Sequence, residues 1–92
     1  MIPQTIRRDH VIQAILDIRS GGVPKKREAT KFNFVYEGRL YPPKFALSLA
    51  CKHPTGDELP ATDFSGGNEA NSFLVSLGFD IQPNIYWRLW IG

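Results

Sequence analysis

The sequence has a single cysteine, Cys51, and lacks any long hydrophobic run. One cysteine excludes an intramolecular disulfide and leaves no Cys-x-x-Cys pair for a metal. The longest apolar stretch, residues 45–51, is far shorter than the roughly 18–20 residues that cross a bilayer, and residues 1–6 lack the apolar core of a signal peptide. We therefore expect a cytoplasmic protein that makes no membrane contact and whose fold is held by packing alone.

The motifs of common catalytic sites are also missing. The chain contains no GxSxG, HExxH, GxxxxGK[ST] or paired-carboxylate motif, so we predict no catalytic residues and no enzymatic activity of its own. Candidate residues for a zinc site or a Cys-His pair are Cys51 and His53, together with His10 and Asp57. Their spacing in the sequence matches no zinc module. We favour an inert, buried thiol, and we expect neither a metal nor a cofactor.

Acidic residues are scarce in the first part of the chain. Residues 1–52 hold ten Lys/Arg against four Asp/Glu, a net charge of +6, whereas residues 53–92 hold one Arg against five Asp/Glu, a net charge of −4. This asymmetry predicts a positive side that attracts nucleic acid or acidic protein surfaces. The alternative is an ordinary solvated surface on which the charges interleave once the chain folds.

Three helices are predicted from apolar spacing and from glycine stops. A chain of 92 residues that is 42% hydrophobic has enough apolar surface for one modest core. The second helix, residues 43–52, is apolar almost all round, and the third follows the N-cap candidates of residues 65–69 and ends at Gly78. The first helix covers residues 8–20, ends at Gly21-Gly22, and has a wide apolar stripe of Val11, Ile12, Ala14, Ile15, Leu16 and Ile18.

Strands are predicted where apolar residues alternate. Residues 32–36 have this pattern, and Glu37-Gly38 is a plausible two-residue hairpin turn before a short strand at residues 39–41. A closing strand is expected at residues 79–81, before Pro83. The element order α-β-β-α-α-β predicts a small single α+β domain over residues 1–83, in which a short antiparallel sheet packs on three helices.

Residues 84–92 form a separate, aromatic tail. This segment is expected to add a strand, cover the core, begin a linker in a longer chain, or associate with a partner or a second copy. Self-association would use Tyr86, Trp87 and Trp90.

Basic residues in the first 52 positions form the candidate DNA-binding site. Lys44, Ser48 and Lys52 recur every four residues, hence on one line along the face of the second helix that is left for solvent. Lys and Arg neutralise phosphates while Tyr or Asn contact sugars or bases. The predicted DNA-binding residues are Lys25, Lys26, Arg27, Lys31, Asn33, Tyr36, Arg39, Tyr41, Lys44, Ser48 and Lys52.

Several segments together resemble a known family. They are DHV at residues 9–11, GVPKKR at 22–27, VYEGRLYPPK at 35–44, DFSGGNEANSFL at 63–74 and LGF at 77–79. The chain resembles the N-terminal head domain of ScoMcrA-like, modification-dependent HNH restriction endonucleases over about residues 6–81. The YPPK and FSGG segments are the most specific parts of this resemblance.

The resemblance implies a setting in DNA restriction and phage defence. In such proteins the head precedes modules that read modified DNA and a nuclease that cuts it, so it implies plain or modified double-stranded DNA and a nuclease domain in cis as partners. Our first hypothesis is a non-catalytic DNA-binding accessory module that contacts mainly phosphates. The second is a protein-interaction domain that positions nuclease modules or self-associates, using the aromatic tail or the acidic residues 57–69.

Overall fold

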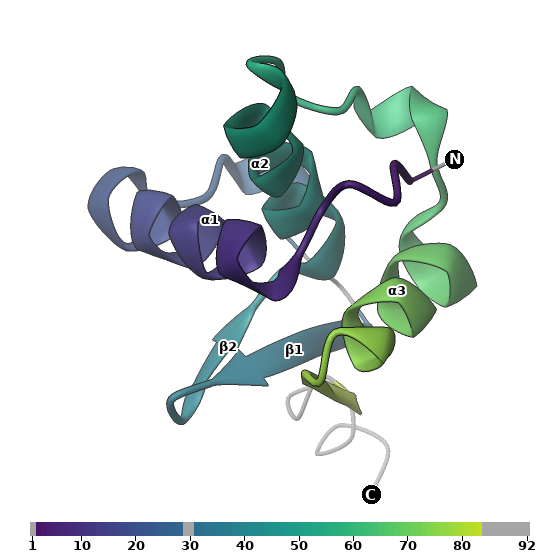
Figure 1. The fold of residues 1–92 in the computed structure, drawn as a ribbon. Coiled ribbons are helices and arrows are strands. Elements are labelled where there is room, and N and C mark those ends of the chain that lie inside the picture. Colours follow the sequence, from purple (N-terminus) through teal and green to yellow (C-terminus); the bar gives the residue numbers. More distant parts are fainter. Residues whose placement is uncertain (1, 29–30, 84–92) are drawn as a thin grey trace, which may run out of the picture.

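The computed structural model describes residues 2–28 and 31–83 as three α-helices and a three-stranded antiparallel sheet (Figure 1). The helices are α1 (Arg8–Gly21), α2 (Pro43–Thr55) and α3 (Asn71–Ser76), and the strands are β1 (Phe32–Tyr36), β2 (Arg39–Tyr41) and β3 (Asp80–Pro83). Two 3-10 turns, η1 (Lys25–Arg27) and η2 (Ala61–Asp63), and a π-helical turn, η3 (Gly66–Ala70), complete the order. The predicted α+β class and element order are confirmed. Within the described residues, no helix has the length and hydropathy to span a bilayer.

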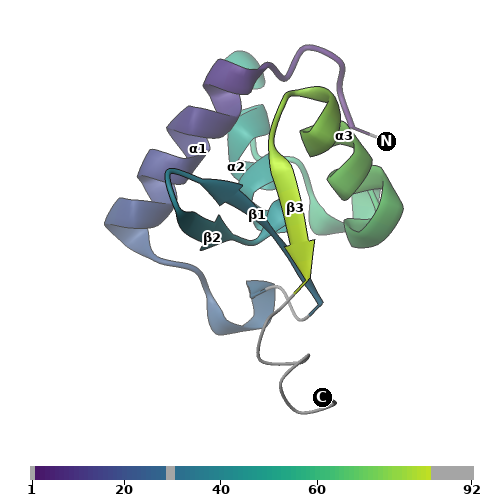
Figure 2. The ribbon, with the colours of Figure 1, turned by 90° about the horizontal axis from the view of Figure 1, so that it is seen from below.

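The sheet has β1 at its centre, in the order β2-β1-β3, with both pairs antiparallel. Phe34 lies opposite Tyr41 on one side and Ile81 on the other. Helices α1 and α2 cover the face to which Phe34 points, and the sheet lies in front of them in Figure 2. Alternation along the strands places Val35 and Leu40 on the opposite face, which no helix of the described chain covers.

The core joins this sheet face to the first two helices. Phe34 is fully buried, and its ring centre lies 5.7 Å from that of Tyr41 and 5.4 Å from that of Phe79. The helices contribute side chains with no exposed surface, among them Val11, Ala14, Ile15, Ala46, Leu47 and Ala50. Because these buried side chains come from β1, β2, α1, α2 and the segment before β3, the core depends on contacts between segments far apart in the chain.

The apolar stripe of α1 is narrower than predicted. Val11, Ala14, Ile15 and Ile18 are buried as expected, but Leu16 is 45% exposed. The prediction of a buried Leu16 is wrong because the side of α1 that meets α2 and the sheet is narrower than the predicted stripe, and Leu16 lies outside it.

Helix α2 is three residues longer than predicted. The expected end at Lys52 is wrong, because the helix continues through Pro54 to Thr55. It ends at Gly56, which adopts the left-handed conformation (φ 89°) and donates its N–H to the Lys52 carbonyl oxygen at 2.8 Å. A glycine at this position satisfies a terminal carbonyl without steric cost, so Gly56 ends the helix.

The hairpin turn provides a test of the local geometry. Glu37 and Gly38 have φ values of 51° and 76°, so both adopt the left-handed conformation that a type I′ turn requires. Gly38→Ala is expected to lower the free energy of unfolding by about 1 kcal/mol, since a Cβ is strained at this φ. Urea denaturation followed by circular dichroism measures the change.

Gly21→Ala is the matched control. Gly21 is the last residue of α1, and no atom lies within 4 Å of the position that its Cβ would occupy. In a right-handed helical conformation, alanine is expected to leave the stability unchanged or raise it by up to about 1 kcal/mol. Equal destabilisation by both substitutions would contradict the turn assignment.

Candidate nucleic-acid interface

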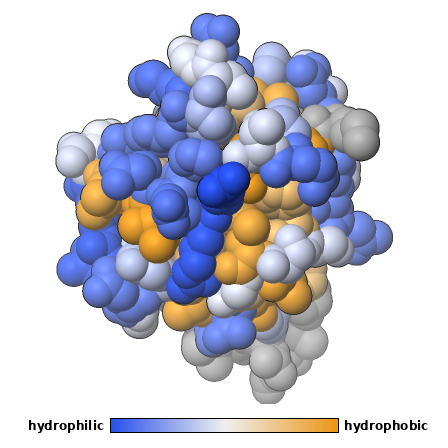
Figure 3. Space-filling view, viewed as in Figure 1, coloured by the Kyte–Doolittle hydropathy of each residue, from blue (hydrophilic) through white to orange (hydrophobic). Residues whose placement is uncertain are grey.

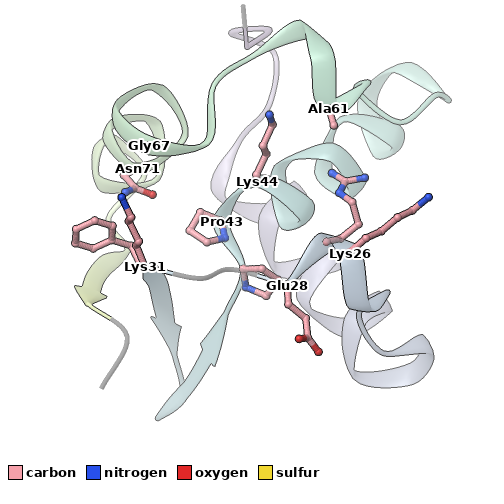
Figure 4. A pocket seen from close by; sticks show the side chains of 11 residues that line it. Lys26, Glu28, Lys31, Pro43, Lys44, Ala61, Gly67 and Asn71 are labelled. Carbon is pink, nitrogen blue, oxygen red and sulfur yellow. The ribbon is translucent and has the colours of Figure 1, made fainter. Parts of the chain in front are cut away.

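A pocket of about 600 Å³ opens beside the N-terminal end of α2 (Figure 4). It lies between η1, the start of β1, the start of α2, and the η2 and η3–α3 segments. Its lining residues are Lys26, Arg27, Glu28, Lys31, Phe32, Pro42, Pro43, Lys44, Ala61, Gly67 and Asn71. The pocket therefore collects residues that are separated by up to 45 positions in the chain.

Four of the predicted DNA-binding cations line this pocket. They are Lys26, Arg27, Lys31 and Lys44, and Glu28 is the one carboxylate among the lining residues. Four positive charges and one negative charge leave a net positive lining, which favours an anionic ligand. On the face of the molecule shown in Figure 3, hydrophilic and apolar residues lie side by side. One basic residue outside the pocket also contacts an apolar group, since the Arg8 guanidinium lies 4.3 Å from the Phe79 ring centre.

Arg27 is held in place by two contacts with α2. Its guanidinium donates a hydrogen bond to Ser48 Oγ at 3.0 Å and lies 5.0 Å from the centre of the Phe45 ring. Ser48 is fully buried, and its carbonyl oxygen accepts the Leu59 N–H at 3.1 Å. The predicted solvent-facing line through Lys44, Ser48 and Lys52 is therefore wrong at Ser48, because η1 and the Leu59 segment pack over the middle of that face.

Lys44 stands at the first turn of α2, close to two other groups. Its Nζ lies 5.2 Å from the Phe64 ring centre. The Ser65 N–H donates to Glu69 Oε1 at 2.9 Å, and this hydrogen bond is the main cause that lowers the pKa of Glu69, to which the charge of Lys44 adds. The Glu69 carboxylate is thus stabilised in its ionised form mainly by a backbone N–H of its own turn.

Lys31 and Asn71 lie on the same side of the pocket, and both line it (Figure 4). Lys31 precedes β1 and is exposed, whereas Asn71 begins α3 and is partly buried. Asn71 Oδ1 is inaccessible to solvent and accepts no hydrogen bond from any residue that the structure describes. Because Oδ1 is closed to solvent in this arrangement, a ligand in the pocket does not reach it, and Asn71 contributes other atoms of its partly buried side chain to the wall.

The two predicted tyrosines lie in the packed part of the sheet. Tyr41 is buried, and its hydroxyl accepts a hydrogen bond from Arg19 Nε at 2.8 Å, which is the main cause that raises the pKa of Arg19. The ring centre of Tyr36 lies 6.1 Å from that of Phe79. Tyr41 thus has no surface for a nucleic acid, because the sheet packs its ring against Phe34.

The other predicted residues lie outside the pocket. Arg39 is at the turn end of the hairpin, about 13 Å along the strand from Phe32, given ~3.3 Å per residue. Asn33 points away from the Phe34 face, while Lys25 and Lys52 are exposed but do not line the cavity. The structure brings four predicted cations together and leaves these positions apart.

The residues considered for zinc or thiol chemistry have local partners. Cys51 is buried, with its Sγ 3.6 Å from Thr55 Oγ1. His53 Nε2 lies 3.1 Å from Asp17 Oδ2 of α1, and His10 Nδ1 accepts the Arg7 N–H at 2.9 Å at the start of the same helix. Cys51, His53 and His10 therefore each make a local contact within the fold.

Phe32 and Asn71 are pocket residues that sequence reasoning did not assign to the site. Phe32 belongs to an alternating apolar strand, a pattern that predicts a core position, and Asn71 follows a predicted N-cap. Asn71 lies within a segment that carries the family resemblance, residues 63–74, whereas Phe32 lies between two such segments. The predicted tail residues Tyr86, Trp87 and Trp90 lie outside the described residues.

Comparison with known families identifies the chain. Residues 4–83 match the family described as "ScoMcrA-like, N-terminal head domain". Because the match spans most of the 92 residues, the chain belongs to this family of head domains, and the resemblance drawn from the sequence is confirmed. Neither the curated proteins nor the solved structures yield a match.

Proposed function

We propose that this head domain is a non-catalytic DNA-binding accessory module of a modification-dependent restriction system in the cytoplasm. It contacts the phosphates of double-stranded DNA with the cations that line the pocket, while a nuclease domain in cis performs cleavage. The observation that carries this proposal is the convergence of Lys26, Arg27, Lys31 and Lys44 from three separate segments.

Phosphate is the chemistry that such a lining fits best. Lys26 and Lys31 are exposed, and their ammonium groups reach an extended polyanion without loss of core contacts. Lysine neutralises phosphates as a point charge, independent of base sequence, so the proposed binding has little sequence preference. Lys25, Arg39 and Lys52 remain proposed outlying contacts for a duplex that extends beyond the pocket.

Duplex binding across a salt series tests the proposal. We expect log K to fall linearly with log salt between about 50 and 200 mM, with a slope of about −3 to −4 if four phosphates are neutralised. Fluorescence anisotropy with plain and base-modified duplexes measures both the slope and any preference for modification. Absence of binding at the lowest salt would contradict the proposal.

A second candidate function is favoured by the outer face of the sheet. Leu40 is 47% exposed there, beside Val35, on a surface without a covering helix among the described residues. Exposed apolar groups of this kind suit contact with another protein module. A chain that binds no duplex at low salt would favour this scaffolding role.

A further inference from the structure

Phe32 gives the pocket an aromatic wall. It lies two residues before Phe34 and so points to the same side of the sheet, but it sits at the end of β1, beyond the part that the helices cover. Phe34 is fully buried, whereas Phe32 is 43% exposed and lines the cavity together with the four cations. A large apolar side chain is thus presented to solvent next to positive charge.

This combination of groups matches a single nucleotide. The cavity of about 600 Å³ falls within the ~300–1,000 Å³ that small-ligand sites occupy. Single-stranded nucleic acid is bound by positive charges that follow the backbone and by aromatic rings on which bases stack. Within a duplex both faces of each base are already stacked on neighbouring bases, so a paired base has no free face on which the Phe32 ring can stack.

We propose that the pocket binds one unpaired nucleotide of a DNA strand. Lys31 and Lys44 hold its phosphate, and the Phe32 ring stacks on its base. The inference rests on the proposed DNA-binding function and names the DNA form that the pocket recognises.

The test compares a blunt duplex with the same duplex carrying a short single-stranded deoxyadenosine extension. The chain is expected to bind the extended duplex about tenfold more tightly, the size of effect that one stacked base contributes. Because the extension also adds phosphates, the Phe32→Ala variant is the decisive comparison. It should lose the tenfold preference, measured as the ratio of its affinities for the two duplexes.

Two further variants separate stacking from a change in fold. Phe32→Trp keeps an aromatic ring and is expected to retain the preference. Leu40→Ala removes another exposed apolar side chain of the same hairpin, on the outer sheet face, and should leave the ratio of affinities unaltered. If the preference is lost in Leu40→Ala, or persists in Phe32→Ala, the assignment of the base to this pocket is overturned.

The outcomes distinguish this inference from the proposed function. Equal affinity for the two duplexes overturns the inference and leaves duplex binding intact. Binding of the extended duplex alone supports the inference and contradicts the proposed binding of a blunt duplex. If neither DNA binds, both the inference and the proposed function are contradicted. Free deoxyadenosine monophosphate that competes as strongly as the extended duplex would show that the pocket takes a free nucleotide, against the proposal of a strand ligand.

Discussion

Replacing Lys26, Lys31 and Lys44 together by alanine is expected to weaken duplex DNA binding by about 10²- to 10³-fold at 0.1 M salt. Each neutralised phosphate contributes about 0.9 to the slope of log K against log salt, so the loss of three contacts should also flatten that slope by about 2.7 units. Anisotropy titrations of the wild-type chain and the variant at several salt concentrations measure both quantities.

The matched control removes three cations that do not line the pocket. Lys25, Arg39 and Lys52 changed together to alanine alter the net charge by the same amount. If the pocket is the main site, this variant should bind with a smaller loss and a slope closer to that of the wild type. Equal losses in the two triple variants would show a diffuse electrostatic attraction and contradict a site at the pocket.

Arg27 is left unchanged in this design because it also supports the fold. Its guanidinium is bound to the buried Ser48 and lies against the Phe45 ring. Removing it would leave the Ser48 hydroxyl buried without this donor, so a loss of DNA affinity would be confounded with a local change in packing. The three lysines make no such hydrogen bond to a buried side chain among the described residues.

The largest effect on stability is expected at Phe34. Phe34→Ala should lower the free energy of unfolding by about 3–5 kcal/mol, because it removes a fully buried ring from the central strand and leaves a cavity. Small domains have about 5–15 kcal/mol in total, so this variant is expected to be partly unfolded near 37 °C. Urea denaturation at 25 °C, with the slope m compared between variants, measures the loss.

Phe32→Ala is the control for this substitution. It makes the same chemical change in the same strand, but at a position that is 43% exposed. Its expected cost is about 1 kcal/mol or less, since less apolar surface is uncovered and water fills the space. A similar loss in both variants would mean that the two rings contribute equally to the core, which would also weaken the assignment of Phe32 to a binding site.

Local elements were predictable because their causes are local. The buried positions Val11, Ala14, Ile15 and Ile18 follow from helical spacing, and Glu37-Gly38 followed from the preference of the hairpin turn for positive φ. The errors at Leu16 and at the end of α2 concern how far an element extends. Those limits depend on which surfaces meet and, for α2, on Gly56, at which the helix ends.

The candidate site was predictable in its charges but not in its shape. The sequence predicts that the whole basic set converges on one face. Lys26, Arg27, Lys31 and Lys44 line one pocket, whereas Lys25, Arg39 and Lys52 lie outside it. Ser48 was expected at the surface, but Arg27 covers it, an arrangement that no helical spacing reveals.

By itself, the sequence determined the family, the α+β order and the supply of positive charge in residues 1–52, since all three are written in local patterns and composition. Only the tertiary structure decided which cations share a pocket and that Phe32 and Asn71 join them. The physical reason is that the pocket forms where η1, the first turn of α2 and the start of α3 pack around the end of β1. Contacts between such distant segments depend on the whole core, not on any one element.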